Sequence, residues 1–120
     1  MKPLLNEQLE QALSYARRGW SVVPAHHLRQ DGDCSCGRPA CGNPGKHPRI
    51  SWTAHQTQAA DEATIQTWWS RWSEANVAIV TGAISGLAVL DIDVAHGGDE
   101  SLHVLEMAHG KLPDTPMVMT

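Results

Sequence analysis

The first regular pattern along the chain is a stripe of apolar residues near its start. Its spacing predicts an amphipathic helix that ends at Gly19. Arg17 and Arg18 would lie in the last turn of this helix, where cations suit the helix dipole. Residues 20–24 then predict a short strand. The members of the stripe are Leu5, Leu9, Ala12, Leu13 and Ala16.

A second stripe at helical spacing lies in the middle of the chain, where Asp61 can cap the helix. Exposed aromatic side chains can stack on nucleic-acid bases, but a stripe at this spacing more often packs in a core. We therefore expect a core helix, with Trp69 as its most exposed member. The members of the stripe are Ile65, Trp68, Trp69 and Trp72.

Two apolar runs follow, and they predict strands over residues 77–81 and 87–92 that form a hairpin. A third helix is predicted from about Asp99 to Ala108, and Gly110 would end it. The order of helix, strand, long loop, helix, hairpin and helix predicts an α+β fold with an antiparallel element. The inward positions of the third helix would be Leu102, Leu105, Met107 and Ala108.

The second of these runs ends in two carboxylates separated by one residue. Alternation along a strand makes Asp91 and Asp93 project together, while Leu90 and Ile92 point into the layer beneath. Adjacent carboxylates repel each other, and a hard cation such as Mg²⁺ or Mn²⁺ removes that cost. A strand-borne Asp-x-Asp pair is also a common base for a two-metal phosphoryl-transfer site. The alternative is a strand end with two solvated aspartates.

The segment between the first strand and the second helix, about residues 26–50, has no periodicity and needs a structural reason for its length. It contains the pattern C-x-C-x4-C-x5-H, and three thiols with one imidazole form a common ligand set for structural zinc. Four protein ligands leave no open position on the ion, so its role would be structural. His26 or His27 could replace the histidine ligand, and a mobile loop with incidental thiols is the alternative. The ligand set would be Cys34, Cys36, Cys41 and His47.

Composition limits the classes of partner. The chain has 120 residues, 42% hydrophobic residues and a formal net charge of −4, so it lacks a global basic footprint for nucleic acid. Four of its nine basic residues nevertheless fall in the loop. No apolar run approaches about 20 residues, and the start lacks a signal-peptide pattern, so we expect a cytoplasmic protein. A cytoplasmic location and an odd number of cysteines disfavour disulfides. The basic loop residues are Arg29, Arg38, Lys46 and Arg49.

The chain resembles the bifunctional DNA primase/polymerase N-terminal (prim-pol) domain of the archaeo-eukaryotic primase superfamily. The long central block around Asp91-Ile92-Asp93 is the most specific part of the resemblance. Some members also carry a Cys/His insertion ahead of a Gly-Lys-x-Pro element, which favours zinc here. The matching segments are residues 12–24, 45–49 with Trp52, 64–72, 76–101 and 110–120.

The resemblance implies that residues 1–120 are the front part of an RRM-like catalytic core with a zinc-binding loop insertion. It implies that Asp91 and Asp93 are catalytic and hold Mg²⁺ or Mn²⁺ for template-directed nucleotidyl transfer. Lys46 and Arg49 would contact phosphate or nucleic acid, although each taken alone is more often a solvated cation. The partners would be a DNA template and primer, nucleoside triphosphates and a helicase domain in the parent chain. Replication of a phage, a plasmid or another mobile element would be the setting.

Members of the family continue into a Thr-Gly-x-Gly-Gly-x-His segment that serves the nucleotide, and into a later metal-binding acid. The chain stops near the expected start of that segment, so residues 1–120 alone are expected not to polymerise DNA. Two other functions stay open: a non-catalytic zinc-containing nucleic-acid-binding module, or another metal-dependent phosphoesterase. His96 and the Gly97-Gly98 turn are weaker candidates for a metal or phosphate contact.

Overall fold

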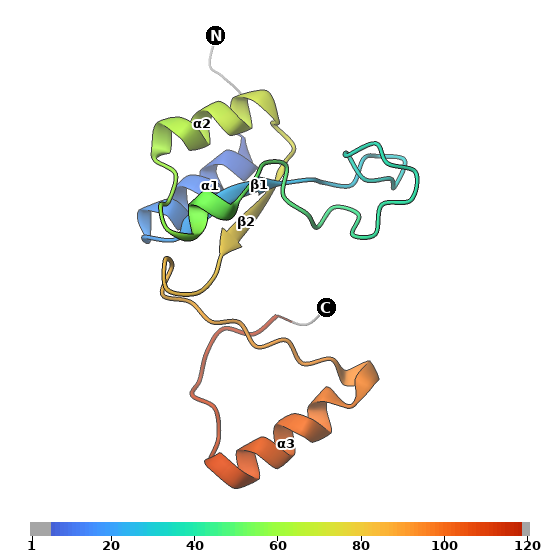
Figure 1. Ribbon diagram of the computed structural model, residues 1–120, viewed down its shortest axis with the longest axis vertical. Coiled ribbons are helices and arrows are strands. Elements are labelled where there is room, and N and C mark those ends of the chain that lie inside the picture. Colours follow the sequence, from blue (N-terminus) through green and yellow to red (C-terminus); the bar gives the residue numbers. More distant parts are fainter. Residues whose placement is uncertain (1–5, 119–120) are drawn as a thin grey trace. The chain divides into compact units, whose positions relative to one another are not determined.

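A computed structural model describes residues 6–118, which divide into two units at Val89 (Figure 1). The first unit contains helix α1, strand β1, a short 3₁₀ helix η1, helix α2 and strand β2. The second unit contains the short helix η2 and helix α3. Helices and an antiparallel pair of strands are both present, so the predicted α+β class is confirmed.

Helix α1 spans Glu7–Arg17 and carries the predicted stripe from Leu9 to Ala16. The Asn6 side chain accepts a hydrogen bond from the Gln8 amide at 3.0 Å and caps the first turn. Gly19 follows the helix with φ +89°, a conformation that favours glycine, and this ends the helix as predicted. Leu5, the first member of the predicted stripe, lies outside the described residues.

The sheet consists of β1 (Ser21–Ala25) and β2 (Asn76–Val80), paired antiparallel with Val22 opposite Ile79. These strands are far apart in the sequence, so the pairing is not the predicted hairpin. All five residues of β1 are buried. Helix η1 (Thr53–Gln56) lies against this strand, and the Ser21 hydroxyl donates to the His55 carbonyl at 2.8 Å.

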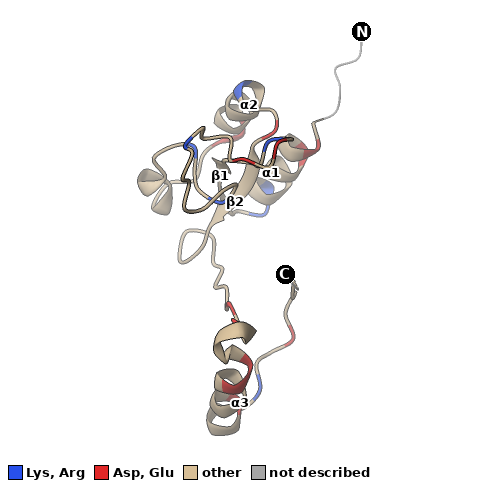
Figure 2. Cartoon of the chain, turned by 90° about the vertical axis from the view of Figure 1, so that its right-hand side faces the viewer, with Lys and Arg blue, Asp and Glu red and all other residues tan. Residues whose placement is uncertain are grey.

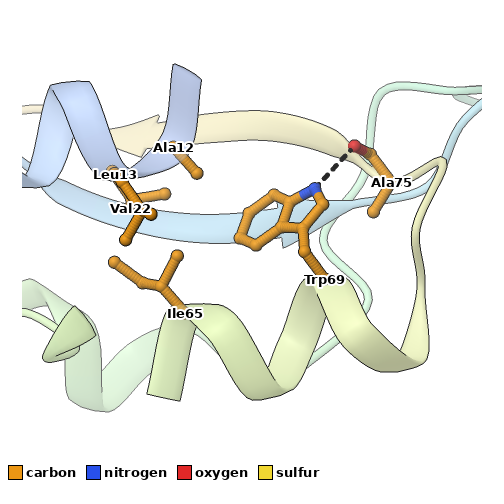
Figure 3. Close-up of a cluster of buried hydrophobic side chains, with 6 residues drawn as sticks. All are labelled: Ala12, Leu13, Val22, Ile65, Trp69 and Ala75. Carbon is orange, nitrogen blue, oxygen red and sulfur yellow. Dashed lines mark hydrogen bonds between the residues drawn. The ribbon is translucent and has the colours of Figure 1, made fainter. Parts of the chain in front are cut away.

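Side chains from α1, β1 and α2 meet in the core of the first unit (Figure 3). Helix α2 spans Glu62–Arg71, and the Asp61 carboxylate accepts from the Thr64 amide at 2.8 Å, which confirms the predicted cap. Hydrogen bonding by the Thr64 side chain, and then by its amide, lowers the pKa of Asp61. The core cluster consists of Ala12, Leu13, Val22, Ile65, Trp69 and Ala75.

The prediction that Trp69 is the most exposed member of its stripe is wrong, because its side chain is only 1% exposed. Its indole Nε1 donates to the Ala75 carbonyl at 3.0 Å, so the polar atom is satisfied inside the core. Trp68 and Trp72 are partly buried and pack against the same cluster. The core role expected for the stripe is therefore confirmed, with a different member at its centre.

Helix α3 of the second unit spans Gly98–His109 and ends at Gly110, close to the predicted bounds. Its predicted inward side chains are not buried: Leu105 is 57% exposed and Met107 is 77% exposed. The predicted strand over residues 87–92 is also wrong. Within the described chain its only backbone bridge joins Leu87 to Gly82, and a strand needs a hydrogen-bonded partner along its length.

Candidate metal centres

Both ends of the loop between β1 and η1 are fastened to the end of β1. The His26 amide donates to the His47 carbonyl at 2.8 Å, and the Arg49 amide donates to the Pro24 carbonyl at 2.9 Å. An isolated antiparallel bridge joins Ala25 to Pro48 between these two bonds. The loop leaves the sheet and returns to it at one place, and so it can close around an ion (Figure 1).

The four predicted zinc ligands lie together inside this loop. The ligand atoms of Cys34, Cys36, Cys41 and His47 are all within 4.8 Å of one another. His47 Nε2 lies 3.5 Å from Cys34 Sγ and 3.5 Å from Cys41 Sγ. A tetrahedral zinc with ordinary bond lengths places such atoms about 3.6–3.8 Å apart, so the donor set fits the ion in number, type and spacing.

Local hydrogen bonds favour the thiolate form of Cys34, whose side chain is buried. Burial alone would raise the pKa of Cys34. Hydrogen bonds from the Gly45 and Cys36 amides, the Cys36 thiol and His47 outweigh this effect and lower that pKa to about 6. Because zinc binds thiolates, this environment prepares the ligand for the metal.

The pKa of the Cys41 thiol is shifted in the opposite direction. A hydrogen bond from the Asn43 backbone would lower the pKa of Cys41. Burial and the neighbouring sulfurs of Cys36 and Cys34 outweigh it and raise that pKa. Neighbouring thiolates therefore oppose one another in the absence of a cation, and a bound cation would relieve the repulsion.

His26 and His27 were possible substitutes for the histidine ligand, but the structure engages both elsewhere. His26 Nδ1 lies 2.8 Å from the Ser35 hydroxyl, and the His26 ring packs on the His47 ring with centroids 4.4 Å apart. His27 Nε2 lies 3.3 Å from a Glu74 carboxylate oxygen. Burial, and then the charge of Arg49, lower the pKa of His26, which favours the neutral ring.

The Ser35 hydroxyl organises these contacts and was missed at the level of sequence. Its oxygen accepts from the His27 amide at 3.1 Å and from Arg49 Nη2 at 2.9 Å. Both lone pairs are then used, so the hydroxyl hydrogen is left for Nδ1 of His26. A serine between two cysteine ligands carries no spacing signal that could have revealed this role.

We expect His47→Ala to lower zinc affinity strongly, whereas His26→Ala keeps about one zinc per chain. The first variant removes a ligand, and the second removes only a neighbour of the ligand set. Zinc content after dialysis against a weak chelator would measure the difference. Equal loss of zinc in the two variants would show that His47 has been given the wrong role.

The loop cations differ in their surroundings. Arg49 is half-buried: it donates to Ser35, lies over the Trp72 ring at 5.3 Å, and has an Nε atom with no partner among the described residues. Burial lowers the pKa of Arg49.

The other loop cations lie nearer the solvent. Arg29 lies 3.6 Å from Asp31 and 3.8 Å from Asp33. Lys46 and Arg38 are exposed and make no ion pair within residues 6–118. Figure 2 shows where Lys and Arg and where Asp and Glu fall along the chain.

The two predicted metal-binding aspartates lie in the second unit and are exposed. Asp93 Oδ2 lies 2.7 Å from His96 Nδ1. Asp91, Asp93 and His96 do not bring three ligand atoms close enough together to hold one ion. Within the part of the chain that the structure describes, the Cys₃His group is the only cluster that does. The expectation that Leu90 points into a layer beneath is wrong, because it is 59% exposed and no strand forms there.

A tight turn fixes the backbone next to Asp93. The Gly98 amide donates to the Asp93 carbonyl at 2.7 Å, and Gly97 has φ +80°. A Cβ atom on Gly98 would lie 2.6 Å from the Asp93 nitrogen and 2.7 Å from its oxygen. Glycine is therefore required at position 98, which explains one half of the Gly-Gly pair.

The geometry defines an α+β protein with a structural zinc-type ligand set and a separate exposed Asp-x-Asp pair. The family of bifunctional DNA primase/polymerase N-terminal domains, Prim-Pol, matches residues 12–120. The chain therefore belongs to this family, as the sequence resemblance indicates. Comparisons with curated proteins and with solved structures gave no significant match.

Membership of the family implies a DNA primase/polymerase role with DNA and nucleotides as substrates, and indicates nucleotidyltransferase activity. The helices within residues 6–118 are all too short or too polar to reach across a lipid bilayer. The cytoplasmic location stays a prediction.

Proposed function

We propose that this chain contributes to template-directed nucleotidyl transfer in DNA replication, as the N-terminal part of a primase-polymerase domain. The family match carries this proposal, because it extends over residues 12–120 and includes both Asp91 and Asp93. A phage, plasmid or other mobile-element setting and a helicase domain in the same parent chain belong to the same proposal.

Asp91 and Asp93 would hold Mg²⁺ or Mn²⁺. Their carboxylates are exposed, and such ions are usually bound through one or two carboxylates together with substrate phosphates, so the donor set fits. When bound, the metal supplies charge for activation of a 3′-hydroxyl and for stabilisation of the leaving pyrophosphate. The Gly97-Gly98 turn holds the Asp93 backbone, and His96 offers a hydrogen bond that orients the Asp93 carboxylate.

The Cys₃His group would hold a structural Zn²⁺ that fixes the loop. Lys46 is the better of the two proposed phosphate contacts, because it is exposed and unpaired with carboxylates among residues 6–118. Arg49 is already engaged with Ser35 and the Trp72 ring. Its contribution to nucleic-acid binding would therefore be indirect, through the position of the loop.

One observation favours a second function, a non-catalytic zinc-containing nucleic-acid-binding module. The zinc-type ligands are already gathered in the first unit, whereas Asp91 and Asp93 belong to no three-ligand cluster in the described chain. In this alternative the loop cations would bind nucleic acid and the aspartates would be solvated residues of a turn.

Primer extension by the full encoded protein would test the first function. With a primed DNA template and deoxynucleotides or ribonucleotides, we expect elongation that requires added Mg²⁺ or Mn²⁺. Mass spectrometry of the products would show whether nucleotides were added in template order. Binding of the template without any extension, under every metal and nucleotide condition, would favour the module instead.

A further inference from the structure

A polar hollow of about 400 Å³ lies in the first unit, between the solvent side of α1, the start of β2 and the closing turn of the metal-binding loop. The neighbouring strand residues complete its lining, and no Asp or Glu contributes to it. The side chains and backbone that give it chemistry belong to Gln8, Gln11, Tyr15, Gly45, Lys46 and Asn76.

Helix periodicity explains why α1 presents a polar side to this hollow. Gln8, Gln11 and Tyr15 follow one another at spacings of three and four residues, so they share one face of the helix. The core-facing residues Ala12 and Leu13 lie on another face. The two glutamine side chains make no hydrogen bond to another residue within 6–118, which leaves their donors and acceptors available.

The metal-binding loop supplies the rim of the hollow. Asn76 Nδ2 donates to the Gly45 carbonyl at 3.0 Å and to the His26 carbonyl at 3.1 Å, so one side chain joins both ends of the loop to β2. Gly45 donates in turn to Cys34 Sγ at 3.4 Å. Lys46 lies between Gly45, which Asn76 holds, and the ligand His47. The zinc-type ligand set therefore helps to fix the backbone from which the Lys46 side chain extends.

The lining selects a class of ligand. A single ammonium group without a competing carboxylate suits one phosphate, as a point charge. Carboxamides provide both donors and acceptors, which are the groups that recognise the edges of nucleobases. Tyr15 also lines the hollow, with its ring already stacked on Trp20 at a centroid distance of 5.5 Å. The volume lies within the range of small-molecule sites.

We propose that this hollow binds one nucleotide unit, with its phosphate at Lys46 and its base at the carboxamides of α1. The unit could be a free nucleoside monophosphate or one residue of a single strand, because the two share this chemistry. The proposal rests on the proposed function for nucleic acid as the partner. The hollow is nevertheless lined by residues before Val89, whereas Asp91 and Asp93 belong to the other unit.

The test measures binding of adenosine monophosphate by calorimetry and of a labelled 12-nucleotide single strand by fluorescence anisotropy, with the zinc-loaded full chain. We expect Lys46→Ala to weaken binding about tenfold and Gln11→Ala about threefold. Lys111→Ala removes the same charge from the other unit and should change affinity less than about twofold. Zinc content and circular dichroism establish that each variant is folded. If Lys46→Ala is not folded, Lys46→Gln replaces it.

Lys46-dependent binding of the monophosphate would identify a free-nucleotide site, and binding of the strand alone would identify a strand contact. Absence of binding to both probes would overturn the proposal. Equal weakening by Lys46→Ala and Lys111→Ala would also overturn it, because that pattern indicates diffuse charge attraction. This binding should not require added Mg²⁺ or Mn²⁺, which nucleotidyl transfer does require, so a failure of the catalytic proposal is distinguishable from a failure of this one.

Discussion

Replacement of Asp91 or Asp93 by alanine in the full encoded protein is expected to abolish nucleotidyl transfer and leave the fold intact. Metal ions stabilise transition-state charge by several kcal/mol, and each 1.36 kcal/mol is a factor of ten in rate. Loss of either carboxylate should therefore lower the rate by about 10²–10³-fold or more. Primer extension in Mg²⁺ and in Mn²⁺ would measure this loss.

The stability of the same variants separates a metal ligand from a structural aspartate. Removing one of two neighbouring carboxylates relieves repulsion, so thermal stability in chelator should rise or stay level. The contact between Asp93 and His96 changes this little, because both side chains are mostly exposed. A structural turn residue would give the opposite result, with lost stability and retained activity.

Asp99 provides a matched control, since it is an exposed acid in the first turn of α3, close to the pair in sequence. Asp99→Asn should keep primer extension within a few-fold of the unchanged protein. Asp91→Asn, which preserves shape and removes charge, should be as inactive as the alanine variant. An active but destabilised Asp93→Ala protein would contradict the catalytic assignment and leave the fold as the only family property.

Local signals in the sequence predicted the helices well. Asp61 caps α2, and Gly19 and Gly110 lie at helix ends, because a cap or an αL residue acts within one turn. The zinc-type quartet was predictable for a related reason. Its four ligands lie within one loop, so proximity in sequence already implied proximity in space.

Strand pairing depended on information that the local pattern does not contain. The run from Leu87 to Ile92 is apolar like a buried strand, but an apolar run does not supply a hydrogen-bonding partner. β2 pairs instead with β1, more distant in sequence, and Val89 is left 77% exposed. The burial of Trp69 has a similar cause. Helical spacing defines a stripe, whereas contacts with α1 and β1 decide which edge of the stripe is buried.

The residues missed at the metal loop are those that act through hydrogen bonds to the backbone or to other side chains. Asn76 holds the Gly45 and His26 carbonyls, and Ser35 joins Arg49 to His26. Neither residue forms part of a ligand pattern. Their roles follow only once the chain has brought the start of β2 beside the loop.

Replacement of the ligand Cys36 is expected to have the second large effect, on zinc binding. Cys36→Ser should lose the bound zinc, which analysis of the unchanged protein should find at about one ion per chain. Serine is a hard, neutral ligand and cannot replace a thiolate at a tetrahedral Cys₃His site. The remaining Cys34 and Cys41 would then face each other without a cation between them.

Loss of the metal should also loosen the loop, because binding energy at such a site is folding energy. Besides the metal ligands, a few hydrogen bonds, including those from the Asn76 side chain, and two isolated bridges, Ala25 with Pro48 and Leu28 with Cys34, hold the ends of the loop. The core of Ile65 and Trp69 lies in other elements and should persist. We therefore expect faster proteolysis within residues 26–50, with the helical circular dichroism largely retained.

Ser14→Ala, at an exposed position on α1, is the matched control and should keep both the bound zinc and the protection of the loop against proteolysis. Full zinc occupancy in Cys36→Ser would refute the ligand assignment. Loss of zinc without faster cleavage would show that these hydrogen bonds and bridges are sufficient to shape the loop.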